Sequence, residues 1–306
     1  MKELAVELFG IEFQNPVMVA SGTFGYGEEY SDLISISELG AFVTKTITLE
    51  PRPGNRPPRI VETSSGMLNS IGLANVGVEE FICSKWPWIR RNRGDARVIA
   101  NIGGRSVAEF SRMARRISGL DGVDGIEVNL SCPNVEEGGV SKLSRLGRIG
   151  EIIRAVCDQT DLPVISKLSP NLLLDIEGMA VEAVESGSRG ISLINTLMGM
   201  DVDVESRRPV LGNVTGGLSG PAILPVGLFA VKKVADAVDV PVIGIGGITS
   251  HRDALKYLIV GASAVQIGTA NFTNPLVCRE VIRGLEAYVR DHRFESISSL
   301  TGSLIE

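Results

Sequence analysis

The stretch Val242-Ile243-Gly244-Ile245-Gly246-Gly247 joins a short apolar run to paired glycines, and a helical pattern over Ser250–Ile259 follows it. The next stretch, Ala264-Val265-Gln266-Ile267-Gly268-Thr269, repeats this arrangement and leads into a further helical pattern over Val277–Asp291. Apolar strands that alternate with helices are typical of a parallel sheet that helices cover. The two stretches therefore predict consecutive strand–loop–helix units of an α/β fold.

The same unit recurs toward the N-terminus. The predicted strands are Val17–Ala20, Ala41–Lys45, Arg97–Asn101, Gly125–Asn129, Val164–Lys167, Gly190–Asn195, Val242–Gly244 and Ala264–Ile267. The other predicted helices are Val107–Ser118, Ile149–Thr160, Ile176–Ser186 and Leu224–Ala237. Eight such units in about 250 residues predict a (β/α)8 TIM barrel. Since no linker or low-complexity tract interrupts the pattern, we expect one domain over residues 1–306.

Two segments fall outside the repeating unit. Ala5–Phe13 alternates around Phe9-Gly10, which predicts an N-terminal β-hairpin at the floor of the barrel. Thr46–Ala96 is a long insertion after the second strand, and its prolines predict turns rather than one helix. Because loops of that length in a compact domain are usually functional, we expect this insertion to belong to the site.

Composition excludes several classes of function. The net charge of −6 argues against general binding to nucleic acid or to an anionic membrane. Two histidines are too few for a multi-histidine metal site, and the four cysteines form no CxxC pair that would hold zinc or an iron–sulfur cluster. We therefore expect no bound metal. We also expect a cytoplasmic protein, because no signal peptide and no membrane span is predicted.

Polar side chains gather at the predicted carboxyl ends of the strands, where TIM barrels place their chemistry. These residues are Ser21, Lys45, Thr46, Asn101, Asn129, Lys167, Asn195 and Thr196. A buried lysine or asparagine costs free energy unless it finds a partner, so the set predicts a ligand site.

Glycine loops after the last two strands predict a phosphate site. Backbone N–H groups in Gly246-Gly247 and Gly268-Thr269 suit an anion, and barrels often bind phosphate at these two loops. Gly220 closes a third glycine cluster after the sixth strand. Because neither a P-loop nor an opening GxGxxG is present, the pattern favours a mononucleotide such as FMN. Lys167 would then stabilise negative charge on the reduced ring.

Cys132 is the one cysteine in a loop at a strand end, within Asn129-Leu130-Ser131-Cys132-Pro133-Asn134. A thiolate can abstract a proton when its pKa lies near the working pH, so Cys132 is the candidate base. We interpret the other three cysteines as packing residues.

These residues together resemble the class 1 dihydroorotate dehydrogenases. The resemblance extends from about Leu4 to Phe272 and rests on several motifs. They are Ala20-Ser21-Gly22-Thr23-Phe24-Gly25, Thr44-Lys45-Thr46, Pro51-Arg52-Pro53-Gly54-Asn55, Asn69-Ser70-Ile71-Gly72-Leu73, the Cys132 loop, Ile194-Asn195-Thr196, Gly217-Leu218-Ser219-Gly220-Pro221 and Gly246-Gly247. Gly66–Leu73 and Arg56–Arg59 look more like class 1B than the fumarate-using class 1A. The resemblance implies oxidation of dihydroorotate to orotate in pyrimidine biosynthesis.

The resemblance also implies a role for each matching residue. FMN would contact Ser21, Lys45, Thr46, Asn101, Asn129, Lys167, Ile194, Gly220, Gly246, Gly247, Gly268 and Thr269. Dihydroorotate would contact Lys45, Asn69, Ser70, Ile71, Gly72, Leu73, Asn129, Asn195 and Thr196. Cys132 would remove the C5 proton while hydride passes from C6 to the flavin. In class 1B a partner subunit with FAD and a 2Fe–2S cluster passes electrons to NAD⁺, and a homodimer of catalytic chains forms the core of a heterotetramer.

Three other interpretations stay open. One is a class 1A enzyme that reduces fumarate. Another is an aldolase-like lyase with Lys45 or Lys167 as a Schiff-base amine, which would leave the asparagines and Cys132 unexplained. The third is a flavin barrel of the tRNA dihydrouridine synthase type, against which the acidic net charge argues.

Overall fold

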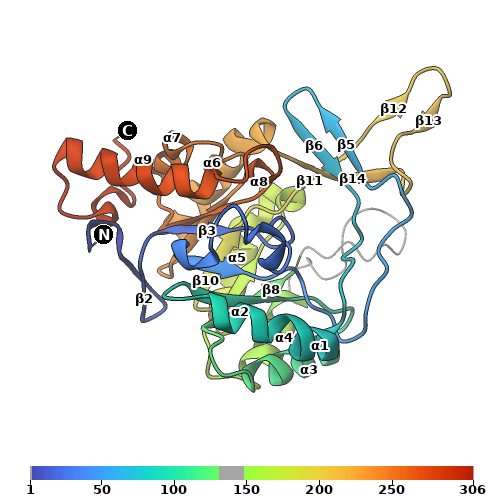
Figure 1. The fold of residues 1–306 in the computed structure, drawn as a ribbon, viewed down its shortest axis with the longest axis horizontal. Helices are drawn as coiled ribbons and strands as arrows, with labels where there is room; N and C mark the ends of the chain where they lie inside the picture. The colour runs from blue at the N-terminus through green and yellow to red at the C-terminus, as the bar shows by residue number, and fades with distance from the viewer. Residues whose placement is uncertain (1, 131–147, 306) are drawn as a thin grey trace.

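The computed structural model describes residues 2–130 and 148–305 and contains a closed barrel of eight parallel strands (Figure 1). In barrel order the strands are β10 (Gly190–Leu193), β15 (Val242–Ile245), β16 (Ala264–Ile267), β3 (Val17–Val19), β4 (Ala41–Val43), β7 (Arg97–Ile102), β8 (Gly125–Asn129) and β9 (Val164–Lys167). The last strand along the chain, β16, pairs with the first, β3, which closes the sheet. The predicted TIM barrel is therefore confirmed.

Helices connect the strands and cover the barrel. They are α3 (Val107–Ser118), α4 (Arg148–Cys157), α5 (Ile176–Glu185), α6 (Leu224–Ala237), α7 (His251–Ile259), α8 (Ala270–Thr273) and α9 (Val277–His292). Short 3₁₀ segments are η1 (Lys2–Leu4), η2 (Glu28–Tyr30), η3 (Ile36–Glu38), η6 (Pro170–Asp175), η7 (Pro221–Ile223) and η8 (Ile297–Leu300). In α3, Ser106 caps the N-terminus, and Phe110, Met113 and Ile117 bury one face against the core. None of the helices in these two ranges is both long and apolar enough to cross a bilayer.

The predicted N-terminal hairpin is present as β1 (Val6–Leu8) and β2 (Ile11–Phe13). Phe9 at its turn packs beneath β10, since a Cβ on Gly190 would lie 2.3 Å from the Phe9 ring. Gly190 is the first residue of its strand, so the hairpin lies at the amino-terminal end of the barrel. The opposite end is left for the site.

Thr46–Ala96 is not one helix, as predicted, but it contains more regular structure than the predicted turns. The segment contains the strands β5 (Ile60–Thr63) and β6 (Gly66–Asn69) and a continuous helical run. The run consists of α1 (Val78–Glu80), the π-helical η4 (Phe81–Lys85) and α2 (Trp86–Asn92). Pro87 is accommodated because it lies in the first turn of α2, where its missing N–H has no helical partner to lose.

Two insertions that are distant in sequence build a second sheet: the first is Thr46–Ala96, and the second is the segment after β10 that contains β11 to β14, residues 197–219. Strands β5 and β6 join β14 (Thr215–Ser219) and β11 (Leu197–Met200) in the antiparallel order β11-β14-β6-β5. The glycine cluster predicted in a loop after the sixth barrel strand is thus mostly strand. Figure 1 shows β5 and β6 rising with the hairpin of β12 (Val202–Asp203) and β13 (Arg208–Pro209) at the end of the molecule away from α9. This sheet supplies one wall of the cavity described next.

Candidate active site

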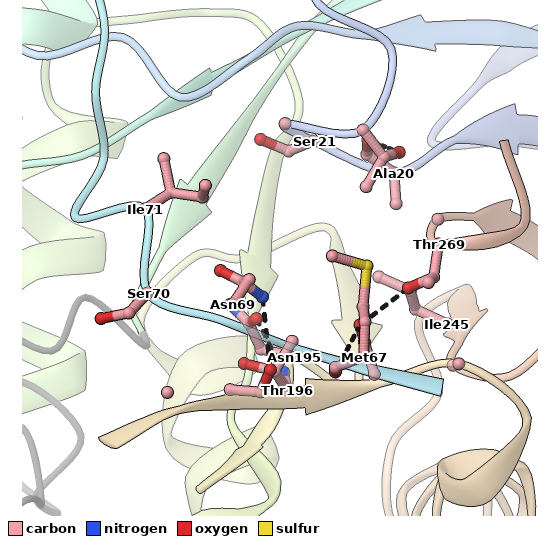
Figure 2. A pocket seen from close by; sticks show the side chains of 18 of the residues that line it. Ala20, Ser21, Met67, Asn69, Ser70, Ile71, Asn195, Thr196, Ile245 and Thr269 are labelled. Carbon is pink, nitrogen blue, oxygen red and sulfur yellow. Dashed lines mark hydrogen bonds between the residues drawn. The ribbon is translucent and has the colours of Figure 1, made fainter. Parts of the chain in front are cut away.

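A cavity of about 830 Å³ lies at the carboxyl ends of the barrel strands, where it also meets the four-stranded sheet. Its lining includes predicted residues from both ligand sets: Ser21, Lys45, Thr46, Asn69, Ser70, Ile71, Gly72, Leu73, Asn129, Lys167, Ile194, Asn195, Thr196, Gly220, Gly246, Gly247, Gly268 and Thr269. In Figure 2, Ser21 faces Asn69, Asn195 and Thr196 across this space. Asn101 lies behind the wall, and Cys132 lies outside the described residues.

One wall comes from the loops after β3 and β4 and from the last residue of β8. The Ser21 hydroxyl lies 3.3 Å from the Thr46 hydroxyl, and the Asn129 amide donates to Thr46 Oγ1 at 3.4 Å. These contacts hold three polar side chains at one rim of the barrel. Their hydrogen-bonding groups can meet the edge of a flat polar ligand.

The opposite wall comes from the four-stranded sheet and the loop after β10. Asn69 donates to the Gly217 carbonyl at 3.4 Å, which ties the insertion of β6 to β14. Position 217 must be glycine, because a Cβ there would lie 2.0 Å from the Thr196 hydroxyl. The backbone N–H of Thr196 is held by the Asn195 side chain at 2.7 Å, so these two residues share one fixed arrangement.

The glycine loop after β15 is held by a residue that sequence reasoning missed. Tyr257 of α7 donates its buried hydroxyl to the carbonyls of Ile245 at 3.1 Å and Gly246 at 2.8 Å. Burial raises the pKa of Tyr257 above its ordinary value, so it stays a donor. Gly246 and Gly247 have φ of +123° and +70°, which L side chains rarely adopt. The loop therefore presents backbone rather than side chains to the cavity.

Two lysines bring positive charge to the cavity. Burial lowers the pKa of Lys45 below the usual lysine value, Arg59 adds to this effect, and Glu29 opposes it. Lys167 is more enclosed, with a side chain that is 6% exposed. An anionic ligand in this space would recover electrostatic energy that these cations lose by leaving water.

Glu127 is the second residue that sequence reasoning missed. It occupies the middle of β8 with no exposed surface, and its carboxylate lies 3.3 Å from Lys167 Nζ. Asn101, predicted as a cavity residue, donates to the same carboxylate at 2.6 Å. The available signal was a charged residue within an apolar strand, two positions before Asn129 and therefore on the same face.

Comparison with known proteins identifies the family. The family model for dihydroorotate dehydrogenase matches residues 3–289. The chain belongs to the dihydroorotate dehydrogenase family. The resemblance that the motifs indicated is thereby confirmed, and the chain is an oxidoreductase of this family.

Dihydroorotate dehydrogenase relatives of full length are similar to this chain. A protein of Citrifermentans bemidjiense is 50% identical over 302 residues, 99% of this chain and 98% of the relative. One of Desulforamulus reducens is 47% identical over 300 residues and covers 98% of both chains. Both are named dihydroorotate dehydrogenase B (NAD(+)), catalytic subunit.

A solved structure supports the fold of this dihydroorotate dehydrogenase. The crystal structure of DHODH from Eimeria tenella in complex with ferulenol superposes with a TM-score of 0.81. It covers 99% of this chain and 89% of that chain at 23% identity. At that identity the likeness concerns the barrel and its layers.

Proposed function

We propose that this chain oxidises dihydroorotate to orotate in pyrimidine biosynthesis, as the FMN-binding catalytic subunit of an NAD⁺-linked enzyme. The supporting observation is that residues from both predicted ligand sets line one cavity at the catalytic end of the barrel. The similar full-length relatives bear the name of such a subunit. We further propose that the whole chain forms one FMN-binding domain.

The residues present fit FMN. The backbone of Gly246, Gly247, Gly268 and Thr269 would hold the phosphate, since the glycines in these cavity-lining loops have no side chain to cover their N–H groups. Lys167 would lie near the ring, and Ser21, Lys45, Thr46, Asn129, Ile194 and Gly220 would contact the remaining surface. Asn101 has a buried side-chain oxygen without a partner in the described chain, and we propose that it acts from behind this wall.

Dihydroorotate would lie between the ring and the four-stranded sheet. Its carboxylate suits Lys45, and its amide edges suit asparagine, which both donates and accepts. The contacting residues would be Asn69, Ser70, Ile71, Gly72 and Leu73 together with Asn129, Asn195 and Thr196. Asn55 holds Ser70 in place through a hydrogen bond of 3.0 Å.

Cys132 would act as the base that removes the C5 proton. It follows Asn129 by three residues, so covalent geometry alone keeps their Cα atoms within about 11 Å. Bound FMN would supply the acceptor for the hydride that leaves C6. The protein would fix the substrate so that the thiolate and the acceptor face the two breaking C–H bonds.

The first prediction concerns the flavin itself. Purified protein loaded with FMN is expected to be yellow and to bleach on anaerobic addition of dihydroorotate, with orotate formed in equal amount to FMN reduced. Absorbance and product analysis measure both. Folded, FMN-loaded protein that stays yellow with saturating dihydroorotate would contradict the proposed function.

The electron acceptor is tested separately. We propose that a second subunit with FAD and a 2Fe–2S cluster carries the electrons to NAD⁺, and that a homodimer of this chain in the cytoplasm forms the core of the complex. NAD⁺ reduction should then require the co-expressed partner. Efficient turnover with fumarate by this chain alone would favour the class 1A alternative.

The second prediction follows from the lowered pKa of Lys45. Lys45 binds the substrate anion as a cation only while it is protonated, so KM for dihydroorotate is expected to rise with pH over a range that begins below the usual lysine pKa. Steady-state kinetics over that pH range measure it. In Lys45→Arg the guanidinium stays charged, so the rise should vanish; an unchanged profile in this variant would exclude Lys45 as its source.

A further inference from the structure

The feature that stability alone does not explain is the Glu127 carboxylate inside the barrel. Gly125, Glu127 and Asn129 alternate to one face of β8, and Asn129 lines the cavity. Glu127 therefore lies one layer deeper, about 7 Å along the strand. TIM barrels usually fill such layers with branched apolar side chains, so a carboxylate here calls for a reason.

Four donors from four other strands meet this carboxylate. Asn101 of β7 donates to Oε1 at 2.6 Å, and Lys167 of β9 lies 3.3 Å from the same oxygen. Ser192 of β10 and Gln266 of β16 each donate to Oε2 at 2.8 Å. The carboxylate thus links strands on different sides of the barrel.

The charge balance of this network involves two groups. Glu127 and Lys167 are the charged side chains that are buried within residues 2–130 and 148–305. The elements β7, β10 and β16 contribute only neutral donors to the Glu127 carboxylate. Burial by itself would raise the pKa of Glu127, but Lys167 and the three neutral donors outweigh it and hold this pKa below its ordinary value. The carboxylate is therefore ionised.

Lys167 connects this buried charge to the cavity. Its side chain belongs to the cavity lining, and its ammonium also meets the Glu127 carboxylate. A lysine has four flexible methylene groups, so a fixed partner is needed to hold its charge at one place. Glu127 supplies that partner from within the barrel, on the side away from any bound ligand.

We propose that Glu127 is a positioning residue of the flavin site. Its carboxylate fixes the Lys167 ammonium and the Asn101 amide, and its negative charge reduces the positive potential that Lys167 exerts on the cofactor. The proposal rests on the proposed function, because it assigns the lysine to FMN. On this proposal, the Glu127–Lys167 ion pair helps to set the reduction potential of the flavin, although only Lys167 lines the cavity.

The test compares the midpoint potential of bound FMN and the FMN dissociation constant of the apoprotein in a set of variants. Glu127→Gln keeps the shape and removes the negative charge, so it should raise the potential. This corresponds to a preference for reduced over oxidised FMN that grows on the order of tenfold. Lys167→Met should lower the potential. The double variant should lie between the two.

A matched control is Ser166→Ala, on the same strand as Lys167. Ser166 is buried and pairs with the Ser188 hydroxyl at 3.0 Å, outside the Glu127 network. The Ser166→Ala substitution removes a buried hydrogen bond without changing the charge, so the midpoint potential of FMN should stay at the wild-type value.

The outcomes separate this inference from the proposed function. If wild-type protein binds no FMN, both fail. If it binds FMN and bleaches with dihydroorotate, but Glu127→Gln leaves the potential at the wild-type value, only the positioning role fails. If Glu127→Gln does not fold, Lys167→Met and the double variant decide. If FMN binding and the midpoint potential, changed in Lys167→Met, return toward the wild-type values in the double variant, the positioning role of Glu127 is supported. If they do not return, that role is overturned.

Discussion

Replacing Cys132 with alanine is expected to leave FMN bound and to lower turnover with dihydroorotate by about 10²- to 10⁴-fold, the usual contribution of a positioned base. The reason is that the C5 proton would have no acceptor, while the residues proposed to hold FMN are untouched. Stopped-flow bleaching of the flavin measures the loss directly, because it reports the reductive step without the electron acceptor.

The matched control for that variant is Cys83→Ala. Cys83 is an exposed thiol on the helical run of the first insertion, outside the cavity lining, so its interpretation as a packing residue was wrong. The flavin of the Cys83→Ala variant should therefore bleach at the wild-type rate. Normal bleaching in Cys132→Ala would remove this cysteine from the mechanism and leave the choice of base open.

Replacing Lys167 with methionine is expected to lower the free energy of unfolding of the apoprotein by about 3 kcal/mol or more, the usual cost of leaving a buried charge without its partner. Glu127 would keep its three neutral donors but lose the only opposite charge that contacts it among the described residues. Denaturant unfolding of the apoprotein measures the loss without any contribution from bound FMN.

Lys233→Met is the control for this prediction. Lys233 pairs with Glu177 at 2.8 Å, but their side chains are 31% and 42% exposed, so water screens the pair. Its loss should cost less than about 1 kcal/mol. Equal effects in the two variants would show that the Glu127 pair has no special cost.

The pH dependence gives a further check on the Lys167 variant. In the wild type the pKa of Glu127 is lowered, so its stabilisation is present above the unfolded pKa and is lost as the pH falls through the folded pKa. Without Lys167, burial favours the protonated form. The deficit in the free energy of unfolding of Lys167→Met relative to wild type should then shrink as the pH falls toward the ordinary glutamate range.

The barrel could be predicted from the sequence because its strands are mostly apolar and are separated by clear helical patterns. Predicted and observed ends differ by a few residues, as where β4 ends at Val43 and β10 at Leu193. The first insertion was harder. Its prolines suggested turns, yet Pro87 occupies a first helical turn, a position that composition alone does not distinguish from a break.

The cavity residues could be predicted because parallel strands bring their carboxyl ends to one side, and the family motifs mark the rest. Three features could not be predicted in this way. Tyr257 contacts the glycine loop from α7, and β6 pairs with β14 although Asn69 and Gly217 are 148 residues apart. In the sequence, Glu127 is a charged residue within an otherwise apolar stretch. Each of these features depends on contacts between residues distant in sequence, which a local sequence pattern does not predict. The role of Cys132 stays a prediction.

The pairing of β6 with β14 also sets an order in which this site can mature. Asn69 and Gly217 meet only after the chain has been synthesised through the second insertion, so the substrate wall cannot form on the first half of the barrel. Contacts of such long range are slow to form during folding. The nascent protein therefore gains its substrate wall late, after most of its strands exist, and a chain that ends before β14 would lack this wall however much of the barrel had folded.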